Sequence, residues 1–418
     1  MVLLFLCLIF GTGRTQKIEA AVQNVPESLE EESRLDTVGT DQETERAAVR
    51  EKKGQQEKEA GDTETDQAAA AQDELLAELD FDAIQQEVDS LLSSQQFSFA
   101  GTVRSLLQDG DPFRTFRAGN AVLSCAKTAF LAQKGLMKEL FLLVLAGAVL
   151  GSFSSLFEGK QVRDASFYMV YLLALALILK NFQSSGANLK AVITSLVAFM
   201  RILTPSYYLA AAAAGGASSA VMFYQMLLLV ILAVEKLLLA LVLPMIHIYL
   251  LIALVNDLSG EEILSHMTEL LETCVNGLLK SSLGVLVGMQ MIRNLIAPAL
   301  DSLRQMALWR TAGMIPGIGN AVNAVTELVA GSAVLIRNCF GVTAMLVLLA
   351  AGMVPAVQLL VSGLSFRLLA AAAQPVSDKR IAGCLAAAGK GYAMLLRLLL
   401  TVEVLFLLTI AILAGTFS

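Results

Sequence analysis

The chain has 418 residues, of which 56% are hydrophobic, and a formal net charge of −7. The charge is uneven, because residues 14–138 hold 24 acidic and 14 basic side chains, whereas residues 139–418 hold 13 acidic and 16 basic ones. The sequence has no cluster of basic residues of the kind that binds nucleic acid, so we expect no nucleic-acid partner. Its two histidines and five cysteines are scattered and lack the spacing of a zinc site, and we expect no cofactor.

The N-terminal run Val2–Phe10 is apolar but too short to cross a membrane. Its length is typical of the hydrophobic region of a signal peptide, and we predict such a peptide over residues 1–20. No basic residue precedes the run, while Arg14 and Lys17 follow it, so the alternative is that the segment is not an export signal.

Residues 21–72 are rich in Glu, Gln, Thr, Asp and Ala and hold few large apolar side chains. Such a segment cannot bury enough apolar surface to offset chain entropy, so we predict an acidic disordered linker. Residues 73–138 instead show leucine, isoleucine and valine at helical spacing among polar residues. This pattern predicts amphipathic helices, which we expect to be extracytoplasmic.

Long windows without any Asp, Glu, Lys or Arg dominate residues 139–418. They cover residues 140–157, 202–234, 237–256 and 338–366. Each is long enough, or nearly so, for a helix rising about 1.5 Å per residue to cross a hydrocarbon layer of roughly 30 Å. We therefore predict an all-α, polytopic integral membrane protein with six to eight spans.

Between these windows, residues 165–179 predict a short span, and the segment between Lys190 and Glu235 predicts two helices that meet at Gly215 and Gly216. Only Glu235 and Lys236 separate the uncharged window 202–234 from the window 237–256. The helices before and after these two residues therefore form either a sharp hairpin or one long rod. The final span is expected at residues 404–417.

Residues 259–280 have one apolar and one polar helical face. Ser259 and Glu262 have the spacing of a capping box at the start of this helix. Because the polar face carries several carboxylates, we expect the helix to lie flat at the membrane surface or to pack on a partner, and not to span.

The sequence Ile315-Pro-Gly-Ile-Gly-Asn320 must interrupt a helix. The simpler interpretation is a break where two half-helices meet, and the alternative is a re-entrant or pore-lining loop. Charged residues flank the break, and they either snorkel to the interface or line a wet passage. The candidate structural or pore-lining residues are Pro316, Gly317, Gly319, Asn320, Asp301, Arg310 and Glu327.

Five basic residues and one acid lie between Arg367 and Arg397. The positive-inside rule predicts that this segment is a cytoplasmic loop, which places the C-terminus outside. Ser377, Asp378, Lys379 and Arg380, after Pro375, predict a helix start. They are also the candidate residues for docking a cytosolic partner.

Several short motifs, in order and at characteristic spacing, resemble the stage III sporulation protein AE family of endospore-forming bacteria. The resemblance covers about residue 113 to the C-terminus. The motifs are Leu243-Pro244, Leu254-Val-Asn-Asp-Leu-Ser259, Ala297-Pro-Ala-Leu-Asp301, Arg310-Thr-Ala312, Ile315-Pro-Gly-Ile-Gly-Asn-Ala-Val322, Pro375-Val-Ser-Asp-Lys-Arg380 and Leu408-Thr-Ile-Ala-Ile412.

This resemblance implies a membrane subunit of a multi-protein assembly in the mother-cell membrane around the forespore. With the other subunits of its operon and a forespore-membrane partner, it would form a channel that sustains late forespore gene expression, and it would not be an enzyme. A homo-oligomer is a further expectation. The alternative is a stand-alone small-molecule permease that uses the interrupted helix; an intramembrane enzyme lacks any nucleophile-base pair that we can name.

Overall fold

The computed structural model describes residues 80–92, 97–109, 118–154, 160–213, 218–259, 264–312, 319–375 and 377–415. All of these belong to one compact unit, Thr65–Ser418. The predicted signal peptide, the predicted linker and the first residues of the predicted amphipathic region lie outside the described residues.

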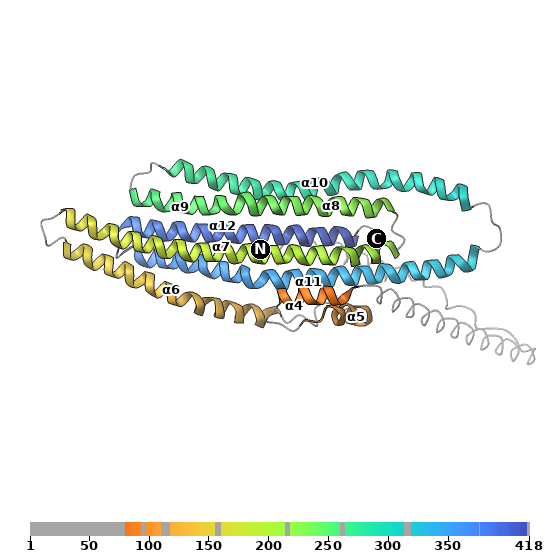
Figure 1. Cartoon of the computed structure of the whole chain (residues 1–418), viewed down its shortest axis with the longest axis horizontal. Coiled ribbons are helices and arrows are strands. Elements are labelled where there is room, and N and C mark those ends of the chain that lie inside the picture. The colour runs from red at the N-terminus through yellow and green to blue at the C-terminus, as the bar shows by residue number, and fades with distance from the viewer. Residues whose placement is uncertain are drawn as a thin grey trace, which may run out of the picture. The chain divides into compact units, whose positions relative to one another are not determined.

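Helices account for all the regular structure in the described ranges, and the long ones lie side by side (Figure 1). In chain order they are α4 (Phe81–Leu91), α5 (Phe99–Asp109), α6 (Ala118–Ser154), α7 (Lys160–Ala213), α8 (Ser218–Leu237), the π-helical turn η1 (Leu238–Val242), α9 (Leu243–Ser259), α10 (Ser265–Ala312), α11 (Gly319–Ala373) and α12 (Lys379–Gly415). The α11–α12 contact is the most extensive, and α12 also packs on α7 and α9.

Five described helical segments are long and apolar enough to span a membrane. They are Phe167–Tyr207, Leu228–Ser259, Ser265–Met289, Gly331–Ala373 and Lys379–Ala411. Their outward faces carry large apolar side chains such as Met169, Leu229 and Leu270, which are 77%, 65% and 58% exposed. A water-soluble bundle would turn such side chains inward, whereas lipid solvates them, so the prediction of an all-α polytopic membrane protein is confirmed.

Several predicted spans are parts of single, longer helices. α7 and α11 contain 54 and 55 residues, which corresponds to about 80 Å each. α7 joins the span predicted at residues 165–179 to the apolar segment after Lys190 through a polar stretch. Since both sides of that stretch are helical and no Pro or Gly pair interrupts it, the helix continues.

Pro244 does not end the rod formed by α8, η1 and α9. The π-helical turn lies just before it, and the backbone N–H of Leu243 donates to the carbonyl of Leu238. A proline removes one helical donor and its ring crowds the carbonyl four residues earlier, and one wider turn relieves that conflict. Of the two arrangements left open by the sequence, the structure has the single rod.

The interval between Arg367 and Arg397 was expected to be a loop, and this expectation is wrong. α11 continues to Ala373 and α12 begins at Lys379, so only a short turn separates the two helices. The basic residues that suggested a loop lie mostly on exposed helical faces, where lysine and arginine are compatible with a helix.

The boundaries predicted for the amphipathic helix at residues 259–280 also need correction. Ser259 is the last residue of α9 and its hydroxyl donates to the Asn256 carbonyl. Glu262 lies outside the described residues, so the predicted capping box stays a prediction. The next α-helix begins at Ser265 and continues to Ala312. The first part of this helix, Ser265–Met289, is the least buried of the five candidate spans. The helix packs on α9 and α12.

The α4–α5 pair packs on α7 and α11 through an aromatic cluster. Asp80 caps α4. The Gln85 side chain donates to the Phe97 carbonyl and accepts the backbone N–H of Phe99, the first residue of α5. The ring of Phe99 lies 5.0 Å from that of Phe340 on α11, centroid to centroid. Within the region in which amphipathic helices were predicted, the described residues form α4, α5 and the start of α6, and the α4–α5 pair is attached to the bundle.

Candidate functional site

The residues predicted to line a passage fall at the junction of α10 and α11. Pro316 and Gly317 lie outside the described residues, and Gly319 and Asn320 begin α11. Asp301 and Arg310 belong to α10 and Glu327 to α11, but their side chains are also outside the described part. Their role in a passage stays a prediction.

The four candidate docking residues form the turn between α11 and α12. The Ser377 hydroxyl donates to the Ala373 carbonyl at 3.0 Å, and Asp378 Oδ1 accepts the Arg380 backbone N–H at 3.1 Å. Asp378 is thus the N-cap of α12, and the predicted helix start is confirmed. Asp378 and Lys379 are exposed, so they are the two members of the set that a partner can reach.

Arg380 is directed toward the bundle and connects two of the motifs. Its guanidinium donates to the Leu258 carbonyl at the end of α9, at 3.4 Å, and lies 5.4 Å from the ring centroid of Phe167 on α7. A cation at a helix C-terminus compensates the unpaired carbonyls there. The motif ending at Ser259 and the motif ending at Arg380 therefore meet at the same end of the bundle.

The same end contains a second set of contacts between helices. The Tyr171 hydroxyl on α7 donates to the buried Leu254 carbonyl at 2.5 Å. Asp257 on α9 lies against Gly383 on α12, where an added Cβ would come within 3.1 Å of the carboxylate. The Asn256 side chain accepts the backbone N–H of Leu264 at 2.8 Å and so holds the start of the next helix.

A polar network occupies the centre of the bundle between α7 and α12. The Asn181 amide donates to the Tyr392 hydroxyl at 2.7 Å, and the Ser185 hydroxyl lies 3.2 Å from that oxygen. Tyr392 is fully buried, and its ring stacks on Phe366 with centroids 5.3 Å apart. These bonds satisfy polar groups that would be costly to bury unpaired.

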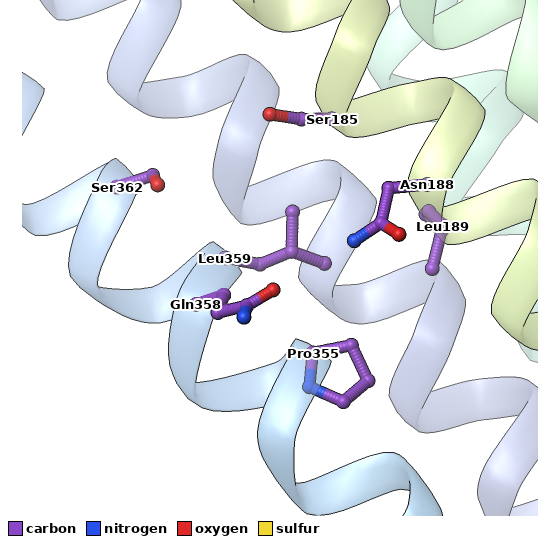
Figure 2. Close-up of a pocket in the computed structure, with 7 residues that line it drawn as sticks. All are labelled: Ser185, Asn188, Leu189, Pro355, Gln358, Leu359 and Ser362. Atoms are coloured by element: carbon purple, nitrogen blue, oxygen red, sulfur yellow. The ribbon is translucent and has the colours of Figure 1, made fainter. Parts of the chain in front are cut away.

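Beside this network lies a pocket between α7 and α11 (Figure 2). Its lining residues are Ser185, Asn188, Leu189, Pro355, Gln358, Leu359 and Ser362. Figure 2 shows the amides of Asn188 and Gln358 directed toward the space between the two helices. The volume is about 40 Å³, which suits ordered water, whereas sites for small molecules typically measure about 300–1,000 Å³.

His247, on α9, packs beside this network. Its Nδ1 lies 2.8 Å from the Leu243 carbonyl, and its ring contacts Phe182 and Gly186, where an added Cβ would come within 2.6 Å of the imidazole. These contacts make His247 a hydrogen-bonded packing residue. No group of three or more potential metal ligands occurs within the described ranges.

The sequence analysis did not single out the residues of this network and pocket. The signal is present, because Asn181, Ser185 and Asn188 recur at spacings of four and three, and Gln358 and Ser362 at four. Polar residues at helical spacing on one face of an apolar segment indicate a buried polar contact between helices.

Comparison with known proteins places these features in a family context. The family model described as stage III sporulation protein AE matches residues 97–416. The chain is 22% identical to the stage III sporulation protein AE of Bacillus subtilis (strain 168) over 291 aligned residues. The aligned region is 69% of this chain and 73% of that protein. No solved structure matches the chain.

Proposed function

Because the chain belongs to the stage III sporulation protein AE family and therefore acts in sporulation, we propose that it is a membrane subunit of a channel between the mother cell and the forespore. It sits in the mother-cell membrane around the forespore, together with the other subunits of its operon and a partner in the forespore membrane. Its role is to assemble and hold the channel, which sustains late forespore gene expression, and it is not an enzyme.

The meeting of two motifs at one end of the bundle carries this proposal. Arg380 bonds to the end of α9, and this arrangement leaves Asp378 and Lys379 exposed at the same turn. A scaffold subunit needs a rigid end that presents a few fixed polar groups to its neighbours, and caps together with a helix-end cation supply that rigidity. We assign this turn to contact with another subunit on the cytoplasmic side.

The pocket between α7 and α11 is too small to be the solute site of a stand-alone permease. A transported solute needs a site near the middle of the membrane that encloses much of its surface. The pocket between α7 and α11 has room for little more than water, and the neighbouring polar side chains bond to one another. These features favour a structural use of the polar residues.

A deletion strain tests the proposal. We expect engulfment to finish and a late forespore reporter to fall to background, with recovery when the gene is supplied in the mother cell only. Normal late forespore transcription in the deletion strain would overturn the channel role. In parallel, vesicles containing only this chain should show no solute flux, and flux without partners would favour the permease.

The double substitution Asp378→Asn with Lys379→Gln separates docking from folding. The asparagine still caps α12, and both changes are isosteric or nearly so, so the purified variant should unfold at the temperature of the native chain. Its co-purification with the other subunits should fall, while Lys390→Gln, an exposed site on α12, should retain it. Unchanged co-purification of the double variant would contradict the assignment.

A further inference from the structure

Glu403 is an acidic residue within the candidate span Lys379–Ala411 of α12, and it is only 7% exposed. Among the described residues, no hydrogen bond or ion pair reaches its carboxyl group. The other buried polar groups of the neighbourhood differ, since Asn181, Ser185 and Tyr392 bond to one another. A charged carboxylate without a partner at this depth is energetically costly.

The neighbouring helix is shaped around this carboxyl group. Glu403 lies against Gly352 of α11, and a Cβ added at Gly352 would overlap both carboxyl oxygens. Pro355 follows in the same turn region, and because proline has no N–H, the carbonyl of Ala351 lacks its usual helical donor. A protonated carboxyl group has an O–H that can donate to a carbonyl left without its donor, whereas an ionised carboxylate has no donor. These surroundings therefore favour the protonated form of Glu403.

None of the arginines that the structure describes on the packed helices forms an ion pair with Glu403. Arg397, on the same helix, is exposed and donates to Asn276 of α10. Arg337 of α11 is buried about four turns before Gly352, which is about 22 Å along the helix. Arg201 of α7 interacts electrostatically with Glu235 of α8.

The other ionisable side chains that the structure describes on the packed helices form no ion pair with Glu403 either. On α9, His247 bonds its own helix and Asp257 lies against Gly383 near the opposite end of α12. Lys180 and Lys190 of α7 and Lys280 of α10 are exposed, and so are His266 and Glu269, which lie 4.0 Å apart. A metal cation would need several oxygen ligands, whereas the surroundings described for Glu403 supply a single carboxyl group.

We propose that Glu403 is a proton-binding site inside the membrane domain, whose carboxyl group is held protonated at neutral pH by its packing between α11 and α12. The ligand is the proton, and Gly352 is the positioning residue that lets the carboxyl group enter the contact. This inference concerns the chain alone and does not depend on the channel role.

Carbodiimide labelling of the full-length chain in lipid nanodiscs tests the site. Dicyclohexylcarbodiimide reacts with protonated carboxyl groups in apolar surroundings, and the modified peptides are identified by mass spectrometry. At neutral pH we expect label on Glu403 and none on Glu269 or Glu272 of α10, whose carboxylates face the polar side of that helix. An unlabelled Glu403, or equal labelling of all three, would overturn the proposal.

Infrared spectroscopy gives a measurement that does not depend on the reagent. The native chain should show the carbonyl band of a protonated carboxylic acid at neutral pH, and Glu403→Gln should remove one component of it, whereas Glu269→Gln should not. If the native spectrum lacks that band, Glu403 is ionised and the proposal fails.

The positioning role of Gly352 has its own matched pair of variants. Gly352→Ala should displace the carboxyl group and change the labelling rate of Glu403 several-fold, whereas Gly284→Ala on α10, where an added Cβ has open space, should not. Equal labelling rates in the two variants would show that Gly352 does not position the carboxyl group.

Discussion

Single buried side chains connect helices that are distant in the sequence. Tyr392 on α12 bonds to Asn181 on α7, and Arg380 on α12 bonds to the end of α9. Around the fully buried Tyr392, water cannot replace a lost partner, whereas the half-buried Arg380 stabilises a helix end at the edge of the bundle. Substitutions at these positions should therefore destabilise the fold measurably.

Tyr392→Phe removes the hydroxyl that accepts the Asn181 amide. We expect a loss of about 1–3 kcal/mol in unfolding free energy, because the amide is left unpaired in the interior. Unfolding in detergent with increasing denaturant measures this loss. Tyr249→Phe is the control, since Tyr249 is equally buried but no hydrogen bond is found for it, and a similar loss there would show that the network is not the cause.

Arg380→Met keeps the length and apolar stem of the side chain but removes its charge. We expect a loss of about 1–2 kcal/mol, because the Leu258 carbonyl and the Phe167 ring lose their cationic partner. Thermal unfolding of the purified chain measures it. Lys379→Met, at an exposed neighbour, should have little effect, and equal losses in both variants would contradict the role of Arg380.

At the scale of elements, packing decides how far each helix extends and which helices attach. α4 and α5 are short, and a helix of 11 residues is marginal alone in water. Their stability comes from contact with α7 and α11, where Phe99 and Phe340 are fully buried. The aromatic cluster is thus the attachment of this pair.

Phe99→Ala should release the α4–α5 pair while leaving the long helices folded. Truncating a buried phenylalanine costs about 3–5 kcal/mol, which exceeds what two short helices can compensate. Limited proteolysis should then cut within residues 81–109 much faster. Phe130→Ala, at a side chain that is 57% exposed, should not change the cutting rate, and protection of α4–α5 in the Phe99 variant would disprove the attachment.

At the scale of the whole molecule, the turns connecting α9 to α10 and α11 to α12 lie at the same end, because Arg380 at the start of α12 contacts Leu258 at the end of α9. Two turns at one end of a membrane bundle must face the same compartment. The basic residues between Arg367 and Arg397 predict that this compartment is the cytoplasm.

Single cysteines at Ser259 and Ser377, introduced into a chain without its native cysteines, should therefore both react from the cytoplasmic side. An impermeant thiol reagent, added to cells and to inverted vesicles, should label both sites only in the vesicles. Labelling of the two positions from opposite sides would contradict the fold, and labelling of both in intact cells would reverse the orientation.

The sequence by itself determined the membrane character, the start of α12 and the family, because uncharged windows, the cap at Asp378 and short motifs are local features. Only the tertiary structure decided that neighbouring windows form single helices of more than 50 residues, since continuation through polar stretches depends on what each face contacts. Tertiary contact also selected the partners of Tyr392, Arg380 and Glu403. Those partners lie on other helices, and no spacing within one segment specifies which distant glycine, carbonyl or amide will pack against it.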